Sequence, residues 1–376
     1  MTSGTDVIVI GGGAVGLSTA WELAQAGASV RLIDRGRCGR EASWAGAGMI
    51  MPGNSLKAVT PEARLRAVSY ELWSSVSQKL VAETEIDNEF RKCGGLEVRF
   101  ETNEATLAEE VDRWRSEGVD VEPLNQKDLS FVESSLSPEL TSGYQLPGMA
   151  QIRNPRHLRA LQTACVQRGV EIVEEAAVVG FDSAETRIRA VRTEGDVFQA
   201  DQVCVCAGAW TSTLLSGCGF RFEIEPVRGQ MVMLKCNPLP FSHIIQAGSR
   251  YLVPRSDGRA LVGSTEERGV GFKKRTTAAG VGGLIRFAIS LVPELADATV
   301  ERTWSGLRPG SPAGVPYLGR VAAFTNLFAA AGHFRCGLQN SPATGRFMRE
   351  LLLGQETCLD PADFGPSVQA DAVAIG

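Results

Sequence analysis

An α/β fold built around a parallel sheet is predicted by three features of the first 34 residues. Residues 7–10 (VIVI) form a short, wholly apolar run, as expected of a parallel strand buried on both faces. Residues 11–16 (GGGAVG) follow at once with the spacing G-x-G-x-x-G. Residues 29–33 form a second strand-like run that ends in Asp34. Residues 17–27 have helical apolar spacing, so this order predicts a β-α-β unit.

Each glycine of this turn suits the binding of a dinucleotide. Gly11 allows the tight turn, Gly13 lets the backbone approach a pyrophosphate, and Gly16 permits close packing of helix on strand. The phosphates would lie at the positive end of the helix. Asp34 is placed to accept hydrogen bonds from a ribose. The unit therefore predicts a dinucleotide cofactor, but it does not separate NAD from FAD.

Composition indicates an ordinary soluble protein. The chain has 376 residues, enough for two domains of roughly 100–200 residues each. Hydrophobic residues make up 44% and charged residues 22%, which argues against a disordered protein and a membrane bundle. The net charge is −5 and no basic run occurs, so we expect no nucleic-acid partner. No apolar run approaches the roughly 18–20 residues that cross a bilayer, so we expect no membrane span.

The cysteines and histidines restrict metal and redox chemistry. The nine cysteines are odd in number and none has the spacing C-x-x-C, so neither a disulfide framework nor a zinc ribbon is indicated. His157, His243 and His333 are the three histidines and lie far apart in the sequence, so we expect no metal site, although carboxylates could still bind a cation. The chain starts without the basic and apolar segments of a signal peptide. These features favour the reducing cytoplasm.

Further elements follow from capping and periodicity. A long helix is predicted to start at Thr60-Pro61, and another is predicted from Asn154-Pro155 to Gly169. Helices are also expected within 101–138. Short strands are predicted at 170–173, 177–181, 188–193 and 203–206.

A loop of small residues follows the second strand and carries a family resemblance. Residues 35–52 read RGRCGREASWAGAGMIMP, and small side chains would let a flat ring lie on the backbone. With the glycine turn, this segment resembles the D-amino-acid-oxidase-like family of FAD enzymes, most closely its glycine oxidase branch. Further motifs resemble that family in the same order: 200–210 (ADQVCVCAGAW), 226–230 (PVRGQ), 251–255 (YLVPR) with 261–266 (LVGSTE), 304–309 (WSGLRP), and 332–337 (GHFRCG) with 341–345 (SPATG).

The resemblance implies two interleaved domains. A Rossmann-type FAD-binding domain would comprise 1–84, 148–222 and 305–365. An α+β substrate domain on a mainly antiparallel sheet would comprise 85–147 and 223–304. Residues 366–376 would form a C-terminal tail.

The resemblance also implies an activity. FAD would accept a hydride from the alpha carbon of glycine or another small amino acid, in an oxidative deamination that needs alignment more than a protein acid or base. Oxygen would reoxidise the flavin and yield hydrogen peroxide, and the imine would feed the synthesis of the thiamine thiazole or hydrolyse. The oligomeric state stays open, with a homo-oligomer compatible with the resemblance.

Four residues are implied to contact the substrate. Arg308 would bind its carboxylate through two parallel hydrogen bonds. Tyr251 would offer its hydroxyl to the same carboxylate. Arg335 would contact the amino acid through its backbone carbonyl or support the ring, with a structural ion pair as the alternative. Met49 would touch the flavin edge or the substrate, with a place in the core as the alternative.

A larger set is implied to contact FAD. Ser43 would bond a phosphate or ribityl oxygen, and Val178 would offer backbone bonds to the adenine. A helix capped by Ser341 would direct its positive end at the flavin pyrimidine ring. The full set is Gly11, Gly13, Gly16, Asp34, Arg35, Ser43, Gly46, Ala47, Gly48, Val178, Gly208, Trp210, Gly306, His333, Arg335, Gly337 and Leu338.

The chain departs from the family at three places. Cys336 stands where asparagine or serine is common, residues 338–340 (LQN) replace an aliphatic run, and Glu266 lies near the expected substrate pocket. Sarcosine, a small D-amino acid or another N-substituted glycine therefore stays open as the substrate.

Three alternative functions stay open as well. A dehydrogenase of the same type would pass electrons to a quinone or partner protein. A nicotinamide-dependent dehydrogenase would satisfy the glycine turn alone. A non-catalytic nucleotide-binding protein would keep the fold without the reaction.

Overall fold

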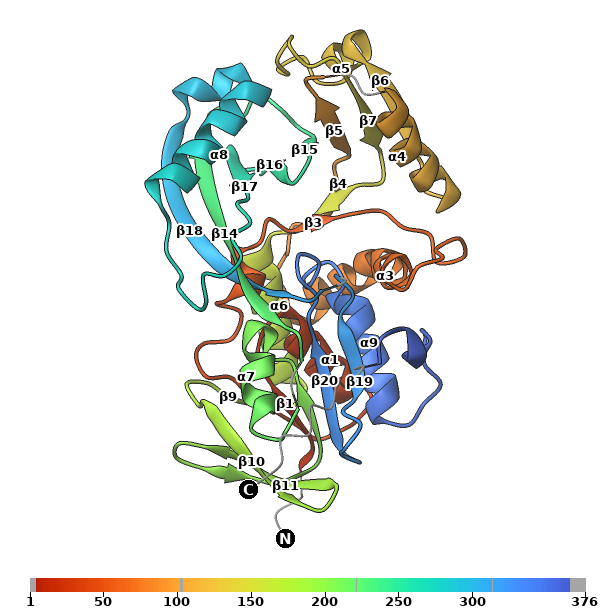
Figure 1. Ribbon diagram of the computed structural model, residues 1–376, viewed down its shortest axis with the longest axis vertical. Coiled ribbons are helices and arrows are strands. Elements are labelled where there is room, and N and C mark those ends of the chain that lie inside the picture. Colours follow the sequence, from red (N-terminus) through yellow and green to blue (C-terminus); the bar gives the residue numbers. More distant parts are fainter. Residues whose placement is uncertain (1–4, 102–103, 221, 313, 366–376) are drawn as a thin grey trace.

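The computed structural model describes residues 5–101, 104–220, 222–312 and 314–365. It has two lobes stacked along its longest axis, and long strands run between them (Figure 1). We call them the parallel lobe and the antiparallel lobe, after the main sheet of each. Within the described ranges, no helix is long and apolar enough to cross a membrane.

The parallel lobe contains a six-stranded sheet in the order β19-β20-β13-β1-β2-β9. Neighbouring strands are parallel except β19, which runs antiparallel to β20. The predicted α/β fold is confirmed, and the apolar run 7–10 lies on the central strand. The strands are β1 (Thr5–Ile10), β2 (Val30–Ile33), β9 (Glu171–Val173), β13 (Ala200–Val205), β19 (Tyr317–Arg320) and β20 (Leu327–Ala331).

Both faces of this sheet are covered, which explains the unbroken apolar run of β1. Val7 and Val9 pack into one core with four helices, whereas Ile8 and Ile10 pack into a second core with α7 and a small antiparallel sheet. The helices are α1 (Ala14–Gln25), α3 (Pro61–Thr84), α6 (Asn154–Gln167), α9 (Ser341–Leu352) and α7 (Thr211–Ser216). The small sheet contains β10 (Val178–Ala184), β11 (Arg187–Thr193) and β12 (Val197–Phe198).

The helix starts follow the predicted caps with one exception. Thr60 caps α3 through its side chain, with a proline directly after it, as predicted. Ser341 was predicted to cap α9, and this prediction is wrong by one residue. The first helical hydrogen bond runs from the Thr344 amide to the Asn340 carbonyl, so Asn340 takes the cap position. The Ser341 hydroxyl donates instead to the Leu338 carbonyl at 2.9 Å.

The antiparallel lobe contains an eight-stranded sheet in the order β18-β14-β17-β16-β15-β5-β7-β6. Its pairs are antiparallel except β15 with β5. The strands are β5 (Gly95–Arg99), β6 (Glu122–Asn125), β7 (Ser142–Leu146), β14 (Glu225–Lys235), β15 (Ile244–Ala247), β16 (Arg250–Pro254), β17 (Arg259–Gly263) and β18 (Thr299–Gly310).

Helices and short elements complete the antiparallel lobe and its junction. One face of the eight-stranded sheet packs on α8 (Ala278–Leu291) and α5 (Gln126–Val132), and the other packs on α4 (Glu104–Ser116). The predicted helices within 101–138 are therefore present, although 102–103 lie outside the described residues. The short elements are β3 (Met49–Ile50), β4 (Arg91–Lys92), β8 (Ala150–Gln151), α2 (Ala42–Ala45), η1 (Gly208–Trp210), η2 (Pro293–Asp297) and η3 (Pro361–Asp363).

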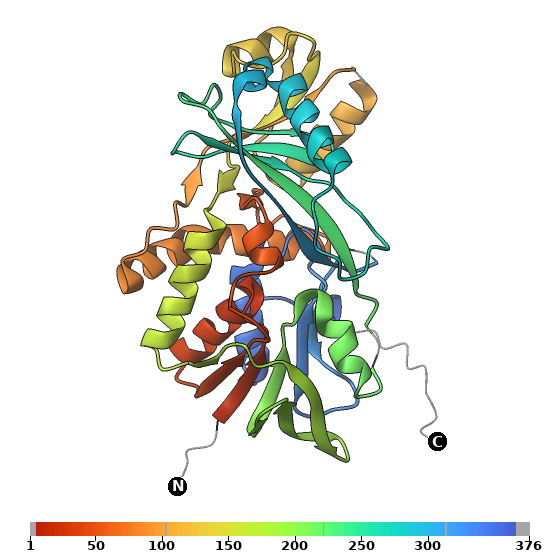
Figure 2. The ribbon, with the colours of Figure 1, turned by 90° about the vertical axis from the view of Figure 1, so that its left-hand side faces the viewer.

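The chain passes repeatedly between the lobes. The parallel sheet takes its strands from 5–33, 171–205 and 317–331, whereas the antiparallel sheet takes its strands from 95–146 and 225–310. Figure 2 shows β14 and β18 descending together from the antiparallel lobe toward the parallel lobe. The predicted interleaving is confirmed. The exact domain limits stay predictions, and the predicted tail at 366–376 lies outside the described residues.

Candidate active site

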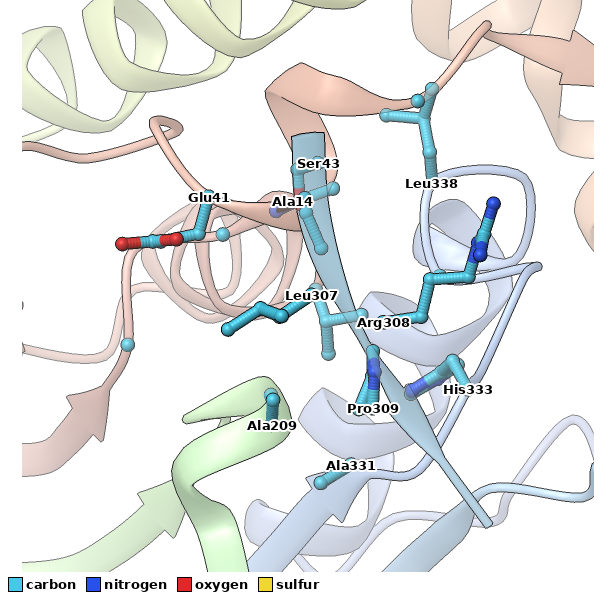
Figure 3. A pocket seen from close by; sticks show the side chains of 18 of the residues that line it. Ala14, Glu41, Ser43, Ala209, Leu307, Arg308, Pro309, Ala331, His333 and Leu338 are labelled. Atoms are coloured by element: carbon cyan, nitrogen blue, oxygen red, sulfur yellow. Dashed lines mark hydrogen bonds between the residues drawn. The ribbon is translucent and has the colours of Figure 1, made fainter. Parts of the chain in front are cut away.

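A cavity of about 910 Å³ extends from the glycine turn after β1 to the antiparallel sheet. Its size is at the upper end of the roughly 300–1,000 Å³ typical of ligand sites. Figure 3 shows Ala14 and Ser43 near the start of α1, with Leu307, Arg308 and Pro309 on the strand that crosses the cavity. The cavity therefore joins the two lobes at the point where β18 enters the parallel lobe.

The glycine turn leaves the positive end of α1 open to the cavity. A Cβ at Gly11 would lie 2.4 Å from the Cys206 carbonyl oxygen, and Gly11 has a φ of 109°, so glycine is required there. A Cβ at Gly16 would lie 1.8 Å from the Gly11 carbonyl oxygen. Ser43 accepts a hydrogen bond from the Ala14 amide at 2.9 Å. A serine hydroxyl thus stands beside the helix amides that would face a phosphate.

Asp34 and Arg35 line the cavity beyond the turn. The Asp34 carboxylate accepts hydrogen bonds from the amides of Gly12 at 2.7 Å and Gly36 at 2.8 Å, which fix its orientation. The Arg35 guanidinium lies 3.4 Å from the centre of the Trp210 ring and pairs with Glu41 at 2.9 Å. This end of the cavity therefore offers an oriented carboxylate beside an arginine that stacks on Trp210.

A floor of backbone and small side chains occupies the middle of the cavity. A Cβ at Gly48 would lie 2.1 Å from the Ile152 carbonyl oxygen, and a Cβ at Gly306 would lie 2.6 Å from the Ala45 side chain. The buried Arg255 donates to the Ala47 carbonyl at 2.8 Å and holds this segment from behind. Larger side chains do not fit at Gly48 and Gly306, so the floor of the cavity stays flat.

Arg308 brings a positive charge to the end of the cavity in the antiparallel lobe. Its guanidinium donates to the Ser264 hydroxyl and to the Thr265 carbonyl, the latter at 3.1 Å. Among the described residues it has no carboxylate within ion-pair distance. Burial lowers the pKa of Arg308, and the neighbouring Tyr251 opposes this effect. A guanidinium stays protonated in proteins, so Arg308 presents a positive charge that is not ion-paired with any of the described carboxylates.

Tyr251 is buried next to Arg308. Its hydroxyl donates to the Met231 sulfur at 3.5 Å, a weak acceptor that a ligand oxygen could replace. A Cβ at Gly263 would lie 2.5 Å from the tyrosine ring, so the neighbouring strand must carry glycine there. Met49 lines the same part of the cavity and is half-buried.

Arg335 is already paired at the edge of the cavity. Its guanidinium contacts Glu266 at 3.4 Å and donates to the Ser249 carbonyl at 2.7 Å. Glu266 also pairs with Arg268 at 3.5 Å. The Arg335 side chain thus makes the ion pair that the sequence left as an alternative, and Glu266 is balanced by two guanidinium groups.

The remaining titratable groups of the lining offer little acid–base chemistry. His333 is buried, with its Nε2 atom 3.0 Å from the Thr344 hydroxyl, and burial lowers its pKa to about 3. Burial raises the pKa of the Cys336 thiol to about 11. At neutral pH the imidazole is therefore uncharged and the thiol protonated.

Comparison with known proteins identifies the family. The model of the family described as "DAO: FAD dependent oxidoreductase" matches residues 6–351. The chain belongs to this family. Its relatives include glycine oxidases of Pseudomonas putida, 35% identical over 96% of this chain and 98% of the relative, and of Pseudomonas aeruginosa, 36% identical over the same shares. The crystal structure of glycine oxidase from Geobacillus kaustophilus is similar with a TM-score of 0.92, at 31% identity over 96% of this chain and 98% of that one.

FAD is the cofactor of this FAD-dependent oxidoreductase, and the cavity fits it. Asp34, the helix amides with Ser43, and the floor at 45–48 all line the cavity, and they supply what an adenosine ribose, a pyrophosphate and a flat ring would each need. The nicotinamide-dependent alternative is thereby removed.

The cavity gathers the residues that the sequence predicts for this oxidoreductase. Every predicted cofactor or substrate residue lines it except Gly16, which instead packs under Gly11. The sequence missed several lining residues of β14, of β15 and of the connection from β15 to β16. Their signal was weak, because only Gly229 within β14 and Gly248 in the connection stand out from ordinary strand residues. The missed residues are Gly229, Met231, Gln246, Gly248 and Ser249.

Proposed function

We propose that the protein catalyses the oxidative deamination of glycine or another small amino acid. The observation that carries this proposal is the guanidinium of Arg308, half-buried at the end of the cavity next to Tyr251 and bonded only to neutral oxygens. A buried charge without a partner costs free energy, which a carboxylate ligand would offset. The family and the glycine oxidase relatives support an amino acid as that ligand.

The substrate carboxylate would take its position from two residues. The guanidinium of Arg308 is a planar fork of two N–H donors that fixes both the place and the plane of a carboxylate. Tyr251 adds a hydroxyl from strand β16 of the same sheet. The backbone carbonyl of Arg335, whose side chain is held by Glu266, would accept a hydrogen bond from the substrate amine. Met49 would bound the space beside the alpha carbon. The glycine oxidase relatives support a substrate with a small side chain or none.

FAD would be held along the whole cavity. Asp34 would accept from the ribose, Ser43 would contact a phosphate, and Val178 would offer its backbone to the adenine. When bound, FAD supplies the two-electron acceptor for the amine. Residues 337–339, which line the cavity directly before α9, support the hypothesis that the positive end of this helix faces the flavin ring.

Among the described residues that line the cavity, none is an evident general base near Arg308, and Glu266 at its edge is paired with Arg268 and Arg335. The carboxylates of the lining, Asp34 and Glu41, are hydrogen-bonded to backbone amides and to Arg35 at the other end of the cavity. His333 is neutral and bonded to Thr344. This arrangement supports a reaction that relies on the alignment of the substrate C–H bond rather than on a protein acid or base.

Oxygen is the electron acceptor that we propose, with hydrogen peroxide as its product. A pathway role in forming the thiamine thiazole is supported by relatives named bifunctional ThiO/ThiG, one of which, from Synechocystis, is 31% identical over 95% of this chain and 53% of its own length. All nine cysteines are free thiols, which fits a reducing cytoplasm.

An anaerobic panel tests the substrate. Glycine, sarcosine, D-alanine, D-proline and the L-forms are mixed with the holoenzyme, and loss of the oxidised flavin absorbance is followed. We expect glycine or a close analogue to bleach the flavin fastest. Bound flavin that none of them bleaches would indicate a non-catalytic protein. Peroxide formation in air then separates the oxidase from a dehydrogenase that uses a quinone or a partner protein.

A further inference from the structure

The position of the Arg308 guanidinium depends on a turn that begins after β17. Its two hydrogen-bond acceptors, the Ser264 hydroxyl and the Thr265 carbonyl, both belong to this turn. Arg308 itself lies on β18, and β14 lies between these two strands in the sheet. The guanidinium thus reaches across β14 to be held, and any movement of the turn would move it.

Thr265 is fixed by both functions of its hydroxyl. The Thr265 hydroxyl oxygen accepts a hydrogen bond from the backbone amide of Gln230 at 2.9 Å. The same hydroxyl donates a hydrogen bond to Glu267 Oε1 at 2.7 Å. Gln230 lies on β14, so the first bond ties the turn to the intervening strand. A threonine hydroxyl has one donor and can accept in the same geometry, so both functions are in use here.

Glu267 anchors this arrangement on β14. Its Oε1 atom also accepts from the Gln230 side-chain amide at 2.7 Å, and its Oε2 atom accepts from the buried Arg228 guanidinium. The backbones of Arg228 and Glu267 exchange two further hydrogen bonds of 2.9 Å each. Burial raises the pKa of Glu267, but the hydrogen bonds from Arg228, Gln230 and Thr265 outweigh this and lower it to about 2. The anchor therefore stays ionised at neutral pH.

The anchor lies behind the cavity wall. Gly229 lines the cavity, whereas its neighbours Arg228 and Gln230 point to the other side of β14, as the alternation of a strand requires. Thr265 is the link between this anchor and the cavity, because its hydroxyl faces the anchor and its carbonyl faces Arg308.

We infer that Thr265, anchored by Glu267 and Gln230, is a positioning residue that holds the Arg308 fork ready for the substrate carboxylate. This inference rests on the proposed role of Arg308. A long side chain that is already fixed loses less rotamer freedom when it binds, so fixing it strengthens carboxylate binding without taking part in the reaction.

The test separates the hydroxyl from the shape of the side chain. Thr265→Val keeps the β-branched shape and removes the hydroxyl, whereas Thr265→Ser keeps the hydroxyl. The dissociation constant of acetate, a carboxylate without an amine, is measured for each holoenzyme from the change in flavin absorbance, together with kcat and KM. For Thr265→Val we expect the acetate dissociation constant and KM to rise about tenfold while kcat changes by less than about threefold. Thr265→Ser should stay close to the unaltered protein.

Thr277→Val is a matched control. The Thr277 hydroxyl accepts from the same Gln230 side chain at 3.1 Å and from the Gly280 amide at 3.1 Å, but it makes no bond to the turn that holds Arg308. This variant should lose some stability at the start of α8 and keep its acetate affinity.

Two results would overturn the inference: an unchanged acetate dissociation constant in Thr265→Val, or an equal rise in Thr265→Val and Thr265→Ser. Arg308→Ala distinguishes this failure from failure of the proposed function. If Arg308→Ala weakens acetate binding and Thr265→Val does not, only the inferred positioning role of Thr265 is contradicted. If Arg308→Ala leaves acetate binding unchanged, the proposed role of Arg308 fails with it.

Discussion

Arg308 lies directly against Gly229 of the neighbouring strand, so closely that a Cβ at Gly229 would be 2.4 Å from Arg308 Nη2. Gly229 does not have a positive φ, so its small size rather than its backbone conformation is what matters. Strand β14 therefore leaves room for the Arg308 guanidinium at Gly229. The adjacent residues of the same strand, Arg228 and Gln230, anchor the turn that holds this guanidinium.

Gly229→Ala should displace the guanidinium and weaken substrate binding. The added methyl group overlaps Arg308, so the fork must move by more than a hydrogen bond tolerates. We expect KM to rise by about tenfold or more with flavin content unchanged, measured by steady-state kinetics. Gly283→Ala is the control, because a Cβ there meets no atom within 4 Å. An unchanged KM in Gly229→Ala would show that the fork does not bind substrate in its present place.

Arg308→Ala should keep the yellow colour and lose substrate affinity. Two charge-assisted hydrogen bonds of roughly 1.5–3 kcal/mol each correspond to about 10²–10⁴-fold in kcat/KM. Arg308→Lys should also lose substrate affinity, because the point charge of a lysine does not reproduce the two parallel hydrogen bonds of a guanidinium. Arg259→Lys alters an arginine that pairs with Glu301 outside the cavity and should behave as the unaltered protein. Wild-type kinetics in both Arg308 variants would contradict the assignment.

The motifs at the cofactor end of the cavity are local in the sequence, whereas the contacts that hold Arg308 at the substrate end are not. The turn at 11–16 and Asp34 are local features, because the chemistry of a tight turn and of the strand after it resides in consecutive residues. The bonds of Arg308 to Ser264 and Thr265 join residues about 40 positions apart, and nothing in their local pattern indicates the contact. The cap of α9 was missed by one residue because Asn340 and Ser341 are both good cap residues, and only the backbone decides between them.

Glu97 should make the protein less stable as the pH rises. Burial is the main cause that raises its pKa to about 7, although the Gly248 amide donates to it at 2.9 Å. The folded state therefore binds more protons than the unfolded state between about pH 4.5 and 7, and the free energy of unfolding falls across this range by about 1–3 kcal/mol. Glu97→Gln should remove this part of the pH dependence in denaturant unfolding of the holoenzyme. An equal dependence of the free energy of unfolding on pH in the unaltered protein and in Glu97→Gln would contradict the raised pKa of Glu97.

Cys336 should not carry a covalent flavin. Its thiol is protonated at neutral pH, because burial raises its pKa to about 11, and a protonated thiol is a poor nucleophile. Acid precipitation should release all flavin into the supernatant, as measured by its absorbance, and Cys336→Ser should bind the same amount. Yellow colour that stays with the precipitate of the unaltered protein and is lost in Cys336→Ser would contradict this prediction.

Capture of the substrate carboxylate by Arg308 should bring the amine into position for oxidation. Anaerobic reduction of the bound flavin, followed against the concentration of glycine and of methylamine, tests it most directly, since the two amines differ in the carboxylate. We predict rapid bleaching that saturates with glycine, almost none with methylamine, and a saturating glycine concentration at least about 100-fold higher in Arg308→Ala. Equal bleaching by the two amines, or an Arg308→Ala variant that saturates like the unaltered protein, would contradict the account.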